Sequence, residues 1–227
     1  MFLAICCLLV TLLLFYTSKK MYKKWNFIFL NPLLVVPILI IVLLSISNVP
    51  YQTYALGTKY VTDLLGPATV AFAIPLYKYA NIIKAHVVEI IGGTFIGSVV
   101  AALSSFVLAV FFHISASIVD SLLPRSVTTP IAMNISQMLG GIPPMTAVFV
   151  IITGLTGAMI GPILIRMFAI QTSLAKGLML GMGAHGAGTS QAFHIGELEG
   201  TYASIGMIIA SGNTMILSYT FLPYLQV

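Results

Sequence analysis

Long runs of apolar residues constrain this chain more than any other feature. A helix needs about 20 such residues to cross about 30 Å of hydrocarbon. Runs that meet or nearly meet this length are Phe2–Tyr16, Phe27–Ile46, Ala85–Phe112, Met145–Ile165 and Tyr202–Leu222. Val61–Ala80 and Leu174–Phe193 are long enough but interrupted by Gly, Pro and polar residues, and Ser126–Leu139 is too short to span alone. We expect an all-α polytopic membrane protein with about seven transmembrane helices (roughly six to eight).

Composition supports a membrane protein. Hydrophobic residues make up 59% of the chain and charged residues 7%, against roughly 25% charged in a soluble domain. A soluble fold of this size could not cover its surface with so few polar side chains. The runs are continuous, whereas the strands of a membrane β-barrel alternate apolar and polar residues. We expect residues 1–227 to form a single integral membrane domain.

Positive charge gathers after the first run. Lys19, Lys20, Lys23 and Lys24 are predicted to lie in a short loop, which the positive-inside rule keeps cytoplasmic, so that the N-terminus lies outside. The net charge of +5 therefore reports topology and not nucleic-acid binding. The adjacent Cys6–Cys7 pair lies in the first run, and we interpret both residues as small packing residues.

Three interruptions fall inside or beside apolar segments. Gly66-Pro67, Thr129-Pro130 and Thr189-Ser190 are each predicted to begin a helix. A helix end leaves N–H groups unpaired, which hydrocarbon cannot satisfy, so such backbone survives only in a watery cavity or inside protein. Broken or re-entrant helices of this kind are typical of transporters. The alternative is that each proline merely kinks a packed helix. The first two interruptions are each followed by a long apolar run, which suggests an internal repeat.

Helix starts that converge would favour an anionic substrate, because each carries about half a positive charge. Small carboxylates fit best, with threonine and serine hydroxyls as hydrogen-bond donors and glycines allowing close approach. The residues predicted to bind substrate are Gly66, Thr69, Thr128, Thr129, Pro130, His185, Gly186, Gly188, Thr189 and Ser190. We find no motif for catalysis, a cofactor or a metal.

The titratable residues leave alternatives open. His185 could take up a proton or pair with a carboxylate, or it could simply bond a neighbouring helix. Glu197 and Glu199 are candidates for proton transfer or pairing, or they cap the membrane interface, with Gly200 after them as a helix end. His194 and Glu197 are spaced to pair on one helix face. For Glu89, we expect an interfacial pair with His86 or Lys84.

Several strings resemble the LrgB/CidB family of bacterial membrane proteins. They are LLGPATVAFAIPLYK (64–78), LLPRSVTTPIAM (122–133), GGIPPMTAVFVIITGLTGAMIGP (140–162) and AKGLMLGMGAHGAGTSQAFHIGELEGTYASIGM (175–207). The last string departs from the family pattern at Ala184 and over 191–194, which puts any role of His194 in doubt. The resemblance implies a holin/antiholin-like effect on murein hydrolases, exerted with a small LrgA/CidA-type membrane partner. It also implies transport, since related proteins carry glycolate and glycerate in chloroplasts and others are linked to pyruvate uptake.

Two functional hypotheses follow. The first is a facilitator or proton-coupled carrier of small monocarboxylates in the bacterial cell membrane, with lysis control as a consequence. The second is a non-transporting regulator of murein hydrolase activity that acts with the small partner. The expected partners are the lipid bilayer, a small carboxylate, the LrgA/CidA-like protein and other copies of the chain, but not nucleic acid.

Overall fold

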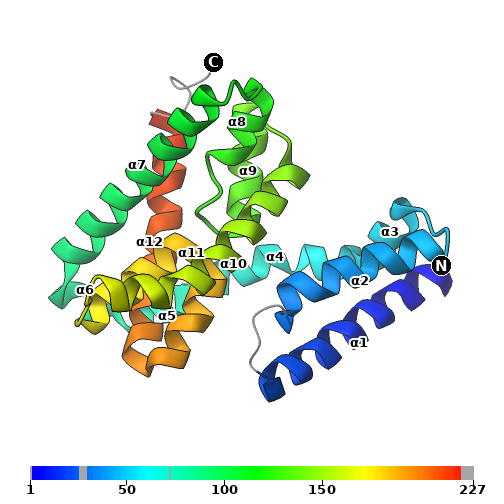
Figure 1. The fold of residues 1–227 in the computed structure, drawn as a ribbon, viewed down its shortest axis with the longest axis horizontal. Coiled ribbons are helices and arrows are strands. Elements are labelled where there is room, and N and C mark those ends of the chain that lie inside the picture. Colours follow the sequence, from blue (N-terminus) through cyan, green and yellow to red (C-terminus); the bar gives the residue numbers. More distant parts are fainter. Residues whose placement is uncertain (1, 26–29, 72, 221–227) are drawn as a thin grey trace. The chain divides into compact units, whose positions relative to one another are not determined.

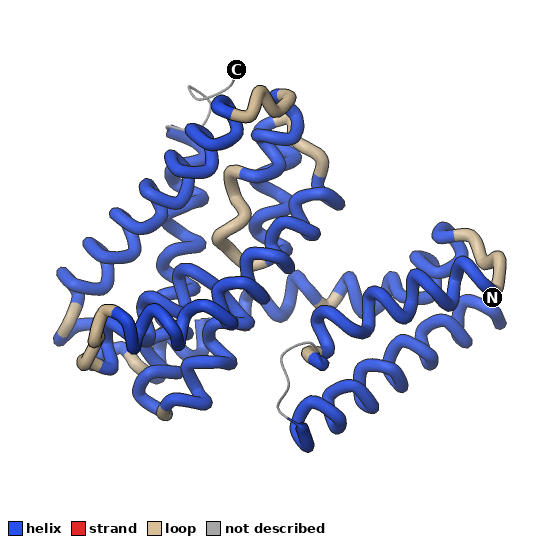
Figure 2. The backbone as a smooth tube through the Cα atoms, viewed as in Figure 1, coloured by secondary structure: helices blue, strands red, loops and turns tan. Residues whose placement is uncertain are grey.

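The computed structural model describes residues 2–25, 30–71 and 73–220, which form twelve α-helices and no strand (Figures 1 and 2). The expected all-α class is confirmed for these residues. The chain divides into two compact units, residues 1–70 and 71–227. Three helical segments of the described residues are long and apolar enough to cross a membrane: Leu3–Trp25, Val87–Phe111 and Pro143–Met167. The total of about seven spans stays a prediction.

The first unit holds α1 (Phe2–Trp25), α2 (Pro32–Ile46) and α3 (Tyr51–Asp63). Helix α3 lies very close to α1, because a Cβ on Gly57 would overlap the backbone carbonyl oxygen of Ala4. A hydrogen bond of 3.4 Å from Thr11 Oγ1 to Tyr54 Oη joins the same two helices. Both cysteines are free, and their side chains are half-buried.

Helix α1 is longer than predicted. It continues to Trp25, so Lys19, Lys20, Lys23 and Lys24 lie on its last turns and the loop predicted for them is wrong. Lysine is a good helix former, and no Gly or Pro interrupts the chain before Trp25. The predicted start of the second run, Phe27, lies outside the described residues.

The interrupted stretch Val61–Ala80 breaks into short helices, as its sequence predicts. After α3 come α4 (Leu65–Ala71), α5 (Ala73–Lys78) and α6 (Ala80–Ala85). Gly66 and Pro67 lie in the first turn of α4, where the missing N–H of proline costs nothing. The helix start predicted there is confirmed.

Long helices dominate the second unit: α7 (Val87–Phe111), α10 (Pro143–Met167), α11 (Ser173–Ile195) and α12 (Glu197–Thr220). Glycines let α11 approach α12 (Figure 1). A Cβ on Gly177 would lie 2.5 Å from Tyr202 Cβ, and a Cβ on Gly181 would overlap the backbone carbonyl of Ala203. Gly177 and Gly181 therefore serve the close packing of α11 on α12.

Two short helices follow α7: α8 (Ala116–Leu122) and α9 (Thr129–Leu139). Val119 and Leu123 form a buried cluster with Ala102 and Ala109 of α7, so α8 turns back along the last turns of that helix. Residues 123–128 join α8 to α9 without regular helix. Neither helix is long enough to span a bilayer, and the pair has the arrangement typical of a re-entrant segment. The predicted start at Thr129-Pro130 is confirmed.

Candidate functional site

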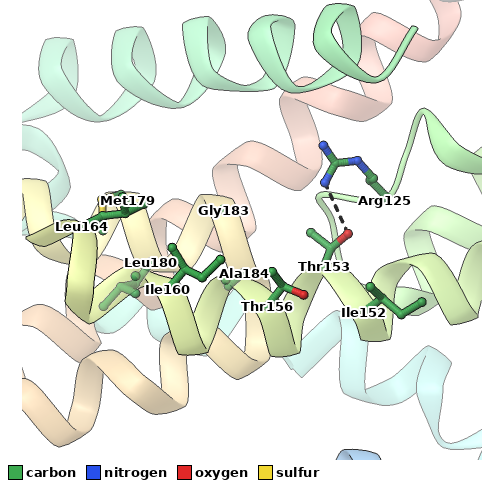
Figure 3. A pocket seen from close by; sticks show the side chains of 12 residues that line it. Arg125, Ile152, Thr153, Thr156, Ile160, Leu164, Met179, Leu180, Gly183 and Ala184 are labelled. Atoms are coloured by element: carbon green, nitrogen blue, oxygen red, sulfur yellow. Dashed lines mark hydrogen bonds between the residues drawn. The ribbon is translucent and has the colours of Figure 1, made fainter. Parts of the chain in front are cut away.

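The loop between α8 and α9 carries Arg125, whose side chain bonds two other helices. Its Nε donates to Ser105 Oγ of α7 at 3.0 Å, and its Nη1 donates to Thr153 Oγ1 of α10 at 3.3 Å (Figure 3). Thr153 lies near the middle of α10, and both α7 and α10 are candidate membrane spans. The guanidinium is therefore held between two candidate spans, near the middle of α10 and in the last two turns of α7.

No acidic side chain balances this charge. All five aspartate and glutamate residues lie in the described part of the chain, and none comes within 4.0 Å of the Arg125 guanidinium. Both of its described side-chain partners are neutral hydroxyls. Because arginine stays charged and carries five N–H donors, donors and charge remain for a further partner. Charged groups inside membrane segments usually pair or mark a substrate or ion path.

Arg125 lies at the edge of a cavity of about 420 Å³, a size usual for small-molecule sites. The wall comes from α10 and the first half of α11 (Figure 3). Most of it is apolar, and Thr153 and Thr156 add hydroxyl groups. The other lining residues are Ile152, Gly157, Ile160, Gly161, Leu164, Met179, Leu180, Gly183 and Ala184. An apolar cavity with a few polar groups around one cation suits a small organic anion.

The start of α9 follows three residues after Arg125. Thr128 is the N-cap residue by backbone angle (φ −63°, ψ 142°), but its side chain makes no cap hydrogen bond. Its hydroxyl is buried and has no partner among the described residues. Thr129 is the first helical residue, so the residue in the N-cap position is Thr128. The first N–H groups of a helix have no intrahelical acceptor, so this end offers donors near the Arg125 loop.

Helix α11 is broken in its middle, at Ala184 (φ −136°, ψ 16°) and His185 (φ 38°, ψ −124°). A positive φ is rare for a residue with a side chain and marks local strain. The helix resumes at once, so Thr189 and Ser190 lie inside its second half and the helix start predicted there is wrong. The Gly-rich segment breaks about one turn earlier than predicted.

His185 closes this break by binding α10. Its side chain is buried, 9% exposed, and Nε2 lies 2.9 Å from the carbonyl oxygen of Val150. Gly154 makes room for the ring, because a Cβ there would lie 2.5 Å from His185 Cε1. The alternative that His185 bonds a neighbouring helix is confirmed.

The other residues predicted to bind substrate do not come together at one site. Gly186 and Ser190 are exposed, and Thr189 Oγ1 makes only a weak contact of 3.9 Å with Met207 Sδ. Gly188 packs against the backbone carbonyl of Leu180. None of the predicted residues lines the cavity, although Ala184, beside His185, does. Gly66 and Thr69 belong to α4 of the first unit.

The acidic residues near the start of α12 have ordinary surroundings. Gly196 ends α11 and Glu197 begins α12, so His194 and Glu197 lie on different helices and form no ion pair. Glu199 Oε1 accepts a hydrogen bond of 2.9 Å from Ser173 Oγ. Gly200 lies buried within α12, so the helix end predicted there is wrong. The predicted surface pair of Glu89 with His86 is confirmed, with 3.8 Å between Oε1 and Nδ1.

Arg125 was missed as a site residue, although the sequence held a signal for it. It is a charged residue between Pro124 and the Thr129-Pro130 helix start, and both neighbouring runs are apolar. An ionisable residue in such a place is a functional candidate by default.

Comparison with known proteins decides the family. The profile of the LrgB-like family matches residues 11–224. The chain belongs to the LrgB-like family. It is 47% identical to the uncharacterized protein YwbG of Bacillus subtilis (strain 168), over 99% of this chain and 100% of the relative. It is 35% identical to the holin-like protein CidB of Staphylococcus epidermidis and 34% identical to that of Staphylococcus aureus, over 98% of this chain and 95% of each relative. No solved structure matches.

Membership of the LrgB-like family agrees with the helices described above. The chain is a helical membrane protein whose relatives include proteins named holin-like. Neither the family description nor the names of these relatives gives a substrate.

Proposed function

We propose that this LrgB-like protein carries small monocarboxylates such as pyruvate, glycolate, glycerate or lactate across the membrane, as a facilitator or together with protons. The observation that carries the proposal is the charge of Arg125. It lies at a cavity of about 420 Å³, among candidate spans, with two hydroxyls and no carboxylate bound to its guanidinium. A bound anion would supply the missing counter-charge.

We assign a role to each polar group at or near the cavity. The free N–H groups of Arg125 bind the substrate carboxylate, and a two-oxygen contact with a guanidinium is a strong one. Thr153 and Thr156 bind the keto or hydroxy oxygen on the next carbon. Outside the cavity lining, Thr128 and the first N–H groups of α9 follow Arg125 closely in the chain and add donors and partial positive charge. The apolar wall of α10 and α11 holds the short carbon chain.

His185 positions the site without touching the substrate. Its bond to Val150 fixes the break in α11, and the break places Ala184 and Gly183 in the cavity wall. This role replaces the direct substrate contact that the sequence predicts for His185.

Uptake by purified protein in proteoliposomes tests the proposal. Labelled pyruvate, glycolate and lactate should each enter at a saturable rate if the protein carries them. Losing hydrogen bonds to a charged group costs about 1.5–3 kcal/mol each, so Arg125→Gln should raise KM at least about tenfold. Arg166→Gln is the matched control, because Arg166 is exposed in the last turn of α10 and does not line the cavity. No saturable flux, or equal flux in both variants, would contradict the proposal.

A second function is favoured by the names of the relatives. Proteins 34% and 35% identical to this chain are named holin-like, which supports a non-transporting, antiholin-like regulator of murein hydrolases acting with a small LrgA/CidA-type partner. Such a regulator has no need of an unbalanced arginine at a cavity. Cells with Arg125→Gln separate the two functions: lysis control should change with transport if it is a consequence of transport, and persist if regulation is direct.

For orientation, we propose a multi-pass protein of the bacterial cytoplasmic membrane with the N-terminus outside. The support is the group of four lysines at the end of α1, which the positive-inside rule keeps in the cytoplasm. An epitope tag before Phe2 should be accessible to antibody in intact protoplasts. If the tag becomes accessible only after permeabilisation, this orientation is wrong.

A further inference from the structure

A second charged residue lies inside the second unit, on α8. Asp120 is only 6% exposed, and no hydrogen bond or ion pair joins its side chain to a described residue. The other acids differ, because Asp63 pairs with Lys59, Glu89 with His86, and Glu199 accepts a bond from Ser173. Glu197 is exposed. Among the five acids, Asp120 is therefore the one that is buried and has no hydrogen bond or ion pair with a described residue.

The surroundings of Asp120 disfavour a negative charge. Its Oδ2 lies 3.8 Å from the Cβ position of Gly140, at the C-terminal end of α9, and the last carbonyls of a helix carry partial negative charge. The nearby Ser121 hydroxyl is committed, since it donates to Ser117 O at 2.6 Å and accepts from Ile142 N at 2.7 Å. An ionised carboxylate that is mostly buried and has no hydrogen-bond donor is costly.

No neighbouring cation relieves this cost. Asp120 and Arg125 are five residues apart but do not pair. Of the helices that pack on α8, α9 has no charged residue, and α7 and α10 carry charge only near their far ends, at Glu89 and Arg166. His113, in the turn before α8, is exposed. Binding of a proton would neutralise the Asp120 carboxylate and so remove the cost of burying an unpaired negative charge.

We propose that Asp120 is the proton site that couples transport to the pH gradient, an inference that rests on the carrier function proposed above. Asp120 takes up its proton from the more acidic side, holds it while a carboxylate anion binds Arg125 and crosses, and releases it on the other side after the anion leaves. One proton and one anion then cross together, so no net charge moves. Both sites lie on the segment from α8 to α9, so that one moving segment would carry both ligands.

The test compares two modes of transport in proteoliposomes. With acid outside, wild-type protein should accumulate labelled pyruvate, whereas Asp120→Asn, which mimics the protonated acid, should not. With equal pH and pyruvate on both sides, Asp120→Asn should still exchange label at close to the wild-type rate, and its exchange should no longer depend on pH. Asp120→Glu should restore at least part of the accumulation. Asp63→Asn, which alters an exposed acid, is the matched control.

The outcomes separate this inference from the proposed function. If wild-type protein transports no carboxylate, the carrier function fails and the inference falls with it. If wild-type protein transports but Asp120→Asn still accumulates pyruvate in a pH gradient, only the inference is wrong. Accumulation driven by sodium instead of protons would also overturn it.

If Asp120→Asn folds but transports poorly, a binding measurement can still test whether Asp120 is the proton site. Calorimetry of pyruvate binding in two buffers of different ionisation enthalpy, at a pH high enough that Asp120 of the empty protein has lost its proton, gives the number of protons taken up. We expect about one for wild-type protein and about zero for Asp120→Asn. Equal proton uptake by the two proteins would contradict the inference.

Discussion

The second unit contains two interrupted helical regions. In one of them the polar groups are bonded within the protein, and in the other they are not. At the break in α11, His185 is bonded to Val150 and packed against Gly154, so its polar atoms are used within the protein. At the start of α9, the Thr128 hydroxyl has no described partner, and Arg125 nearby has no counter-charge. Polar groups that are hydrogen-bonded within the protein indicate a structural role. Buried polar groups that lack a hydrogen-bond partner or a counter-charge indicate a place where a ligand can bind.

This difference reverses the prediction made from the sequence. The Gly-rich segment, 181–200, looks like the centre of a site, but Gly181 packs closely against α12, and Gly154, Gly157 and Gly161 of α10 make room for α11. The proposed binding groups come instead from the loop before α9 and from the middle of α10. The break in α11 supplies the shape of the cavity wall and not its hydrogen bonds.

The largest expected effect on stability is at the α11 break. Gly154→Val puts side-chain atoms where the His185 ring lies, since even a Cβ would be 2.5 Å from Cε1. Overpacking of this kind costs about 1–3 kcal/mol, and loss of the bond to Val150 adds to the cost. Thermal unfolding in detergent should show a clearly lowered Tm. Gly93→Val is the control, because nothing lies within 4 Å of a Cβ there; equal Tm values for the two variants would contradict the packing described for His185.

A smaller and opposite effect is expected at the start of α9. Thr128→Val removes a buried hydroxyl that bonds nothing in the described residues, so stability should stay the same or rise slightly. If the hydroxyl binds substrate, KM for uptake should rise about three- to tenfold. His185→Ala should act mainly on stability, with a lower Tm and a smaller rise in KM, because His185 shapes the cavity wall without touching the substrate. The comparison fails if both variants alter stability and leave KM alone.

The sequence predicted where most helices lie, because long apolar runs and the prolines after Gly66 and Thr129 are local signals. It placed the restart of α11 at Thr189-Ser190 and not directly after His185, because several positions in a Gly-rich segment can break and the fit of the His185 ring depends on Gly154, which lies far away in the chain. It also took Gly200 as a helix end, although this glycine packs against Phe193 across the α11–α12 turn. Contacts of this kind depend on the tertiary structure and leave little trace in local sequence.

The two charged residues were missed for a different reason. Arg125 and Asp120 are visible in the sequence, but the burial of Asp120 and the failure of the two to pair are facts of the fold. Without them, a charge between short helices is easily read as part of an exposed loop. The useful signal was the rarity of charge in this chain, 7% of residues, together with the helix breakers beside Arg125.

Protection of a cysteine in the cavity tests the central claim most directly. Thr156 lines the cavity and is exposed, so Thr156→Cys, in a chain with Cys6 and Cys7 replaced by alanine, should react with a charged thiol reagent. Pyruvate should slow this reaction, whereas pyruvamide, an uncharged analogue of similar size, should not. Adding Arg125→Gln should abolish the protection, and a cysteine at the exposed Gln171 should never be protected. Absence of protection by any carboxylate, or protection that survives Arg125→Gln, would contradict an anion site at Arg125.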